Sequence, residues 1–216
     1  MALGKKKARM KKTVLYVVRH GESEGNINGD ITGANPPLTA RGRMQAHELA
    51  QSLLQLKIDA VYSSPLVRAH HTAQVIADSR NLPITISPQI KERYFGSLEG
   101  KKGDEVRSLY KQKYDAFEKA TPEEQLTWKV VDDMESFIEV YNRVIPFFDE
   151  ITELHIGRSI LLVSHAHVLL SLLINLGFAT FNELPFGAIK NTGSIAIEKE
   201  NGVYKISSVS GITKKI

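Results

Sequence analysis

Four side chains with catalytic potential lie at or just after the ends of apolar runs that predict buried strands. The runs are residues 13–18, 58–64 and 159–164, and the side chains are Arg19, His20, Arg68 and His165. If these strands are parallel, their carboxyl ends meet at one edge of a sheet, where ligands of open α/β sheets bind. We therefore expect the two histidines and two arginines to share one site.

Arginine and imidazole in one site favour phosphoryl chemistry. A guanidinium group binds phosphate oxygens in pairs, and a helix that begins after a strand adds free N–H groups. Neutral imidazole can attack phosphorus and form a covalent intermediate. Taken singly, an arginine after a strand is usually a surface charge, and a lone histidine at a strand end is more often a satisfied polar group. Taken together, the four residues leave the phosphate-site reading and the structural reading evenly balanced.

The pair His165 and His167 has a spacing that also occurs in zinc sites. A catalytic zinc ion needs three protein ligands, and a two-metal site needs clustered carboxylates. Here the strand ends carry arginines, which repel a cation, and no Asp-x-His or His-Glu-x-x-His pattern accompanies the pair. We therefore expect no metal and no other cofactor, and EDTA should leave activity intact.

Strand patterns alternate with helical patterns along the chain, which predicts an α/β fold. Helices are expected at 39–56, 64–79, 133–154 and 166–176. The dipeptide Asn201-Gly202 predicts a hairpin over 194–209. Residues 100–132 are charged and weakly periodic, which predicts a helical excursion or lid. These elements must hold the polar strand ends in place.

Composition fits a single globular domain of 13–216 preceded by a basic tail. The chain has 216 residues and a net charge of +4, but six positive charges lie within residues 1–12, and without them the net charge is −2. We interpret 1–12 as a disordered terminus or an added leader before a native start at Met10. No nucleic-acid module is expected. Cysteine is absent, which suits a cytoplasmic location.

Membrane insertion is not expected from the sequence. The one stretch long enough to cross a bilayer, 159–179, carries His165, His167 and Asn175 in its middle. A buried strand followed by a helix explains that stretch better.

Four stretches, taken in order, resemble the motifs of one enzyme family. The opening stretch, VVRHGESEGNINGDITGANPPLTARG at 17–42, looks like the first motif of the histidine phosphatase superfamily, which includes cofactor-dependent phosphoglycerate mutases and many phosphomonoesterases. The later motifs resemble VYSSPLVRAHHTA (61–73), KERYFGSLEG (91–100) and LLVSHAH (161–167), and NTGSIAI (191–197) is similar to the closing strand. The resemblance implies a three-layer α/β/α sandwich with a mostly parallel central sheet.

The resemblance also implies a role for each matching residue. His20 would be the nucleophile that carries a phosphohistidine, with its other ring nitrogen held by a backbone carbonyl. The phosphoryl oxygens would be bound by Arg19, Arg68 and His165, and substrate contacts would come from Asn26, Thr32, Gly33 and Ala166. Glu92 would be the general acid, and a bound phosphate dianion should raise its pKa. Ala166 stands where the family commonly has glycine, so phosphate binding depends on a negative φ there.

Three functions remain open for such a site. The first is a metal-independent phosphatase that acts on small phosphorylated metabolites. The second is a phosphoglycerate mutase, and the third is a non-catalytic phospholigand-binding protein. Gly25 precedes the motif asparagine where family mutases carry an aromatic residue, and residues 100–135 contain only one arginine, Arg107. We therefore rank the phosphatase first, with a small substrate as partner, and leave a homodimer open.

Overall fold

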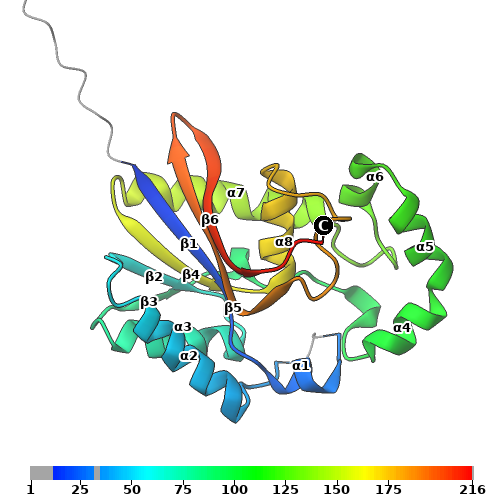
Figure 1. Ribbon diagram of the computed structural model, residues 1–216, viewed down its shortest axis with the longest axis horizontal. Coiled ribbons are helices and arrows are strands. Elements are labelled where there is room, and N and C mark those ends of the chain that lie inside the picture. Colours follow the sequence, from blue (N-terminus) through cyan, green and yellow to red (C-terminus); the bar gives the residue numbers. More distant parts are fainter. Residues whose placement is uncertain (1–11, 32–34, 216) are drawn as a thin grey trace, which may run out of the picture.

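A six-stranded sheet forms the centre of the protein (Figure 1). The computed structural model describes residues 12–31 and 35–215, so the predicted tail, apart from Lys12, lies outside the described residues. The strand order is β3-β2-β4-β1-β5-β6. The strands are β1 (Thr13–Arg19), β2 (Ala60–Ser63), β3 (Ile84–Ile86), β4 (Ser159–Ser164), β5 (Ile189–Glu200) and β6 (Val203–Ile212).

The first four strands in chain order are parallel, and their register aligns the carboxyl ends of β1, β2 and β4. Strand β4 pairs with β1 on one side and β2 on the other. Arg19 lies opposite Ser164, and Ser63 lies opposite Val163. All three strands therefore end at one edge of the sheet, as predicted from the positions of the polar residues.

Side-chain alternation along the central strands builds a hydrophobic core on each face of the sheet. Leu162 packs into the core beneath α7 (Phe137–Leu154) and α8 (Ala166–Asn175). Its neighbour Val163 packs into the opposite core with α2 (Ala40–Ser52) and α3 (Val67–Asp78). Both valine and leucine are fully buried because a parallel sheet is covered on both faces. The predicted three-layer sandwich is confirmed (Figure 1).

Strands β5 and β6 form the predicted hairpin and add an antiparallel edge to the sheet. The turn places Asn201 at φ 53° and Gly202 at φ 80°, the left-handed pair that a tight hairpin requires. The hairpin is longer than predicted, since β5 already begins at Ile189. Its early start brings the segment 191–192 next to the end of β1.

The predicted helical excursion consists of α4 (Gly103–Leu109), α5 (Lys111–Lys119) and α6 (Pro122–Thr127). In Figure 1 these helices extend to one side of the sandwich, near the carboxyl edge of the sheet and near α1 (Glu24–Asn28). A small separate core anchors the excursion, formed by Leu98, Val106, Val130 and Met134. We call residues 103–128 the lid below.

Two helix starts differ from prediction. Helix α3 begins at Val67 rather than Ser64, because the Ser64 hydroxyl accepts the Leu66 N–H in a turn and contacts His165 instead of capping a helix. Helix α7 begins at Phe137 rather than near Asp133. Ser136 caps it with Glu139, while the Asp133 carboxylate accepts the Ser97 N–H. Within 12–31 and 35–215, no helix combines the length and apolar character needed to cross a bilayer.

Candidate active site

The structure brings His20, Arg68 and His165 together at the carboxyl edge of the sheet. All three are almost completely buried, with at most 2% of their surface exposed. The rings of His20 and His165 lie edge to face with centroids 5.1 Å apart. Arg68 Nε donates to His20 Nε2 at 3.1 Å. Arg68 reaches this position from the first turn of α3, and His165 is the residue before α8.

Hydrogen bonds assign one tautomer to His20. Its Nδ1 lies 2.6 Å from the Gly21 carbonyl oxygen, which can only accept, so Nδ1 carries the proton. Nε2 then holds the lone pair and accepts from Arg68. Burial, reinforced by the charges of Arg68 and Arg19, lowers the pKa of His20 from 6.5 to about 3. The imidazole is therefore neutral at physiological pH, the form in which it can attack phosphorus.

Several buried donors at this edge have no hydrogen-bond partner among the residues that the structure describes. They are Arg68 Nη1 and Nη2, Arg19 Nε, and His165 Nδ1. Leaving a buried donor unpaired costs about 1–3 kcal/mol, and more for a charged group. Donors concentrated in this way favour an anion that accepts several hydrogen bonds at once, and a phosphoryl group does so.

His165 is oriented by Ser64 in the turn after β2. The Ser64 Oγ lies 2.8 Å from His165 Nε2, and among the described residues this ring nitrogen is the acceptor within reach of the buried Ser64 hydroxyl proton, so we assign that proton to the contact. This leaves the N–H of His165 on Nδ1. Burial is the main cause that lowers the pKa of His165 well below 6.5, so the ring is a neutral donor. The use of Ser64 in this contact explains why it does not cap α3.

Arg19 and Ala166 line a cavity of about 440 Å³ beside the buried histidines. Arg19 ends β1 and donates through Nη1 to the Ile189 carbonyl, which leaves the rest of its fork free. Burial lowers the pKa of Arg19, although it stays a cation at neutral pH. Ala166 is the first residue of α8 and has right-handed helical backbone, so its methyl group causes no strain. Its N–H belongs to the free first turn of that helix.

Asn26 lines the same cavity from α1. Its Oδ1 accepts from the Ser23 N–H at 3.1 Å and from Asn191 Nδ2 at 3.2 Å. The side-chain oxygen is thus occupied, and the amide N–H₂ remains as a donor. The predicted substrate contacts Thr32 and Gly33 lie outside the described residues.

Glu92 lies in the same cavity, in the segment between β3 and the lid. It accepts from the Arg93 N–H at 2.9 Å and from the His167 N–H at 3.2 Å. His167 Nδ1 lies 3.5 Å from the second carboxylate oxygen. Burial raises the pKa of Glu92, but His167, His165 and the Arg93 N–H together outweigh burial and bring the pKa well below its ordinary value. The pKa rise expected for this residue is therefore not a property of the protein alone.

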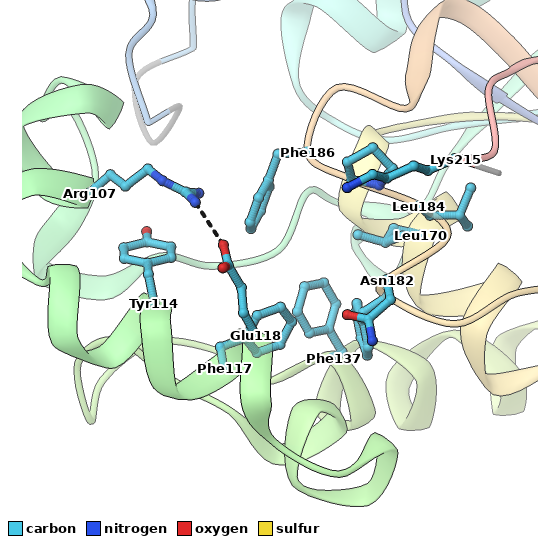
Figure 2. A pocket seen from close by; sticks show the side chains of 12 residues that line it. Arg107, Tyr114, Phe117, Glu118, Phe137, Leu170, Asn182, Leu184, Phe186 and Lys215 are labelled. Atoms are coloured by element: carbon cyan, nitrogen blue, oxygen red, sulfur yellow. Dashed lines mark hydrogen bonds and ion pairs between the residues drawn. The ribbon is translucent and has the colours of Figure 1, made fainter.

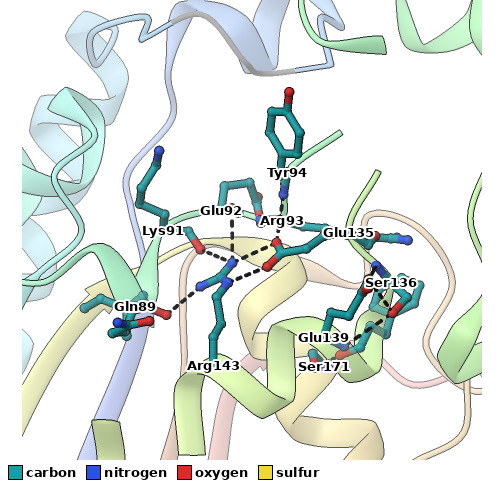
Figure 3. A network of polar contacts seen from close by, with 12 residues as sticks. Gln89, Lys91, Glu92, Arg93, Tyr94, Glu135, Ser136, Glu139, Arg143 and Ser171 are labelled. Atoms are coloured by element: carbon teal, nitrogen blue, oxygen red, sulfur yellow. Dashed lines mark hydrogen bonds and ion pairs between the residues drawn. The ribbon is translucent and has the colours of Figure 1, made fainter. Parts of the chain in front are cut away.

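The buried Arg93 and the partly exposed Arg143 hold the Glu92 segment in place (Figure 3). Arg143 of α7 donates to the backbone carbonyls of Lys91 and Glu92 and pairs with the Glu135 carboxylate at 2.7 Å. Arg93 donates to the Glu135 and Trp128 carbonyls and stacks on a phenylalanine ring of α7. Arg93 therefore does not line the substrate cavity, and its hydrogen bonds go to backbone carbonyls. These contacts join the candidate acid to the base of the lid.

Sequence reasoning missed three residues of the site. His167, which stands out in the sequence only for its zinc-like spacing with His165, contacts Glu92. Asn191 and Thr192 both donate to the His20 carbonyl, each at 3.3 Å. Thr192 has φ 59°, a conformation that costs energy for a residue other than glycine and that places its N–H toward His20. The stretch NTGSIAI was visible in the sequence, but its proximity to β1 was not.

The two histidines with zinc-like spacing turn to different partners. His165 contacts Ser64, whereas His167 contacts Glu92. Within 12–31 and 35–215, no three His, Asp or Glu side chains are grouped closely enough to hold a metal ion. Independence from metal stays a prediction for the EDTA experiment.

Known proteins with similar sequences include several named as phosphatases and one named as a probable phosphoglycerate mutase. The chain is 36% identical over 163 residues to an adenosylcobalamin/alpha-ribazole phosphatase of Escherichia coli, which covers 74% of this chain and 76% of that one. It is 37% identical over 158 residues to phosphoserine phosphatase 1 of Hydrogenobacter thermophilus, over 70% of each chain. The solved structure of Bacillus stearothermophilus YhfR superposes with a TM-score of 0.79 at 29% identity, over 93% of this chain and 98% of that one.

The family pattern extends over almost the whole described chain. Residues 15–210 match the histidine phosphatase superfamily (branch 1), so the family and fold expected from the sequence motifs are confirmed. The predicted phosphohydrolase class agrees with the names of the relatives. This protein belongs to the histidine phosphatase superfamily, branch 1.

Proposed function

We propose that the protein hydrolyses phosphomonoesters of small metabolites through a phosphohistidine on His20. One observation carries the proposal: a neutral, fully buried imidazole whose Nε2 lone pair lies among unpaired guanidinium and imidazole donors. The N–H of Nδ1 is held by the Gly21 carbonyl, so the attacking nitrogen keeps a constant orientation.

The first chemical step transfers the phosphoryl group to His20. Nε2 attacks phosphorus, a P–N bond forms and the bond to the alcohol oxygen breaks. The donors of Arg19, Arg68 and His165 bind the three equatorial oxygens, where charge is spread in the transition state. Arg68 Nε occupies the Nε2 lone pair in the protein alone and gives up this contact as phosphorus approaches.

Glu92 supplies the proton that the leaving alkoxide needs. Its low pKa means that the carboxyl is ionised before substrate binds. A proton must therefore enter with the substrate, either on a phosphate monoanion or because a bound dianion raises the pKa of Glu92. In the second step water attacks phosphorus, Glu92 takes a proton from that water, and inorganic phosphate leaves with His20 neutral again.

The names of two relatives support a small phosphorylated substrate. They are phosphoserine phosphatase 1 and a probable phosphoglycerate mutase. The chain contains no cysteine, which fits a cytoplasmic location. A homodimer remains a prediction that sedimentation would test.

A phosphomonoester panel with a parallel mutase assay on 3-phosphoglycerate tests this function. We expect phosphate release from at least one monoester, loss of that release in His20→Ala, and little mutase activity. Labelled enzyme trapped during turnover should carry an acid-labile, base-stable phosphoryl group, as a phosphoramidate does. Unchanged turnover in His20→Ala would contradict the covalent mechanism, and dominant mutase activity would replace hydrolase with isomerase.

A further inference from the structure

A second cavity of about 550 Å³ adjoins the catalytic cavity beneath the lid (Figure 2). The two cavities share three wall residues: Arg107, Tyr114 and Phe186. Its volume lies within the roughly 300–1,000 Å³ typical of pockets that bind small organic molecules. None of the residues assigned to phosphate binding above lines this second cavity.

Phe186 connects the two cavities. It lies in the loop between α8 and β5 and is 53% exposed. It also lines a third, smaller cavity of about 170 Å³, whose walls include Arg19, Ala166, His167 and Leu170. Leu170 in turn lines the second cavity. The three cavities are therefore adjacent to one another around Phe186.

The walls of the second cavity are mainly aromatic and aliphatic. The phenylalanines 117, 137 and 181 pack against one another, with ring centroids of neighbouring pairs 5.3 Å and 4.7 Å apart. Leu170 and Leu184 complete the apolar part of the lining. Such a surface gains free energy from covering apolar atoms of a ligand and loses it when it covers hydroxyl groups without partners.

Charge near the shared wall is already neutralised. Arg107 pairs with Glu118 at 3.0 Å beside the cavity, and its guanidinium lies near the rings of Tyr114 and Phe186 (Figure 2). Both side chains of the pair are more than half exposed. Because the pair is internally balanced, it does not itself select for a second anionic group on the ligand. The lining also includes the cation Lys215, which is drawn on the opposite side of the view from Arg107 (Figure 2).

We propose that the second cavity binds the alcohol part of the substrate, and that the preferred substrates are phosphomonoesters of extended apolar alcohols. The proposal rests on the phosphatase function proposed above. With the phosphoryl group at His20, a short polar alcohol stays within the first cavity and leaves the second cavity unfilled. An extended apolar alcohol passes Phe186 and transfers its own methylene groups from water to the aromatic and aliphatic walls of the second cavity.

Linear alkyl phosphates test this proposal because the leaving-group chemistry hardly changes with chain length. We would measure kcat/KM for ethyl, butyl, hexyl and octyl phosphate, each below its aggregation concentration. A buried methylene contributes about 0.8 kcal/mol, so kcat/KM should rise about threefold or more with each added methylene until the cavity is filled. Phosphate release should depend on His20 for every ester.

Asn182 allows the location of the effect to be tested. It is exposed and lines the second cavity but neither of the other two. Asn182→Trp would fill part of that cavity, and we expect the octyl-to-ethyl ratio of kcat/KM to fall at least about tenfold. Ile156→Trp adds an indole at an exposed position outside all these cavities and should leave the ratio as in the wild type. Circular dichroism would show that both variants fold.

The outcomes separate this inference from the proposed function. A flat dependence on chain length with His20-dependent turnover overturns the apolar subsite and leaves the phosphatase in place. A rising dependence that Asn182→Trp does not change places the subsite elsewhere and overturns its assignment to this cavity. If no ester is hydrolysed in a His20-dependent manner, the proposed phosphatase function itself fails.

Discussion

The active site has a phosphate end around His20 and a lid end around Phe186, and the two ends differ in how deeply their residues are buried. At the phosphate end, His20, Arg68 and His165 are at most 2% exposed and lie where parallel strands end. At the lid end, Phe186 is 53% exposed and Arg107 belongs to an exposed ion pair on short helices. The first end is enclosed by two hydrophobic cores, whereas the second is anchored by a small core and by Phe117 of α5, which packs into the core beneath α7 and α8.

From this difference we infer that the phosphate end carries out the chemical step and that the lid end determines substrate selectivity. Donors held in a buried site do not reorganise when charge develops, which is the main source of electrostatic catalysis. A surface formed by short helices and a loop can change without disturbing those donors. We therefore expect substitutions at the phosphate end to change the rate for every substrate, and substitutions at the lid end to change the order of substrates.

The largest effect should come from removing the proton donor. Glu92→Gln keeps the shape of the side chain but cannot protonate an alkoxide, so kcat/KM for an alkyl phosphate should fall by about 10²–10⁴-fold. For p-nitrophenyl phosphate, whose leaving group needs no proton, the loss should be much smaller. Steady-state kinetics with both substrates would check this. Equal losses on the two esters would show that Glu92 has another role.

A matched pair of arginine substitutions compares the two ends directly. Arg68→Lys replaces a fork of donors with one charge in a fully buried position, and kcat/KM should fall by about 10²–10³-fold. Arg107→Lys changes a pair that is exposed to solvent, and the loss should stay below about threefold. Both variants would be assayed on one ester. Similar losses would contradict the division between the ends.

Acid should destabilise the protein through its buried neutral histidines. Folded His20 has a pKa of about 3, compared with 6.5 ordinarily, so below pH 6.5 the unfolded chain binds a proton that the folded chain does not. Its contribution to stability is therefore complete above pH 6.5 and decreases as the pH falls toward 3. Between about pH 7 and pH 5 the free energy of unfolding should fall by about 2 kcal/mol from His20 alone.

Urea unfolding at the two pH values would measure this loss. His165 adds to it in the same direction, since its pKa is also lowered by burial. His20→Asn removes one titrating group and should reduce the acid-induced loss by about 2 kcal/mol. His47→Asn, at an exposed position of α2, serves as the matched control and should lose as much stability as the wild type. An identical loss in His20→Asn would show that His20 is not held neutral.

The smallest effect should come from the contact that links the ends, His167 with Glu92. His167→Leu removes the Nδ1 contact with the carboxylate and keeps the backbone N–H. The pKa of Glu92 should rise, so the decline of kcat/KM with increasing pH should move to higher pH by a few tenths of a unit to about one unit. His71→Leu on the exposed face of α3 should not move the profile. An unchanged pH profile of kcat/KM in His167→Leu would show that His167 only packs against its neighbours and does not affect the pKa of Glu92.

Much of the phosphate end could be predicted from the sequence, because the positions of its residues follow from apolar runs in neighbouring residues. Continuous apolar runs predict strands buried on both faces, and the residue that follows each run must emerge at the carboxyl edge. These patterns predict that Arg19, His20 and His165 lie together at one edge of the sheet. The helix starts at 64 and 133 were wrong, since Ser64 and Asp133 bind to distant segments instead of capping helices.

The sequence by itself determined the fold class, the family and which residues meet at the sheet edge. Only the tertiary structure decided how Glu92 is held, because its contact with His167 joins residues 75 positions apart. The same holds for the Arg143 contacts behind it and for the three cavities that meet at Phe186. Strand periodicity is recorded in neighbouring residues, whereas the shape of a cavity depends on how separate segments pack.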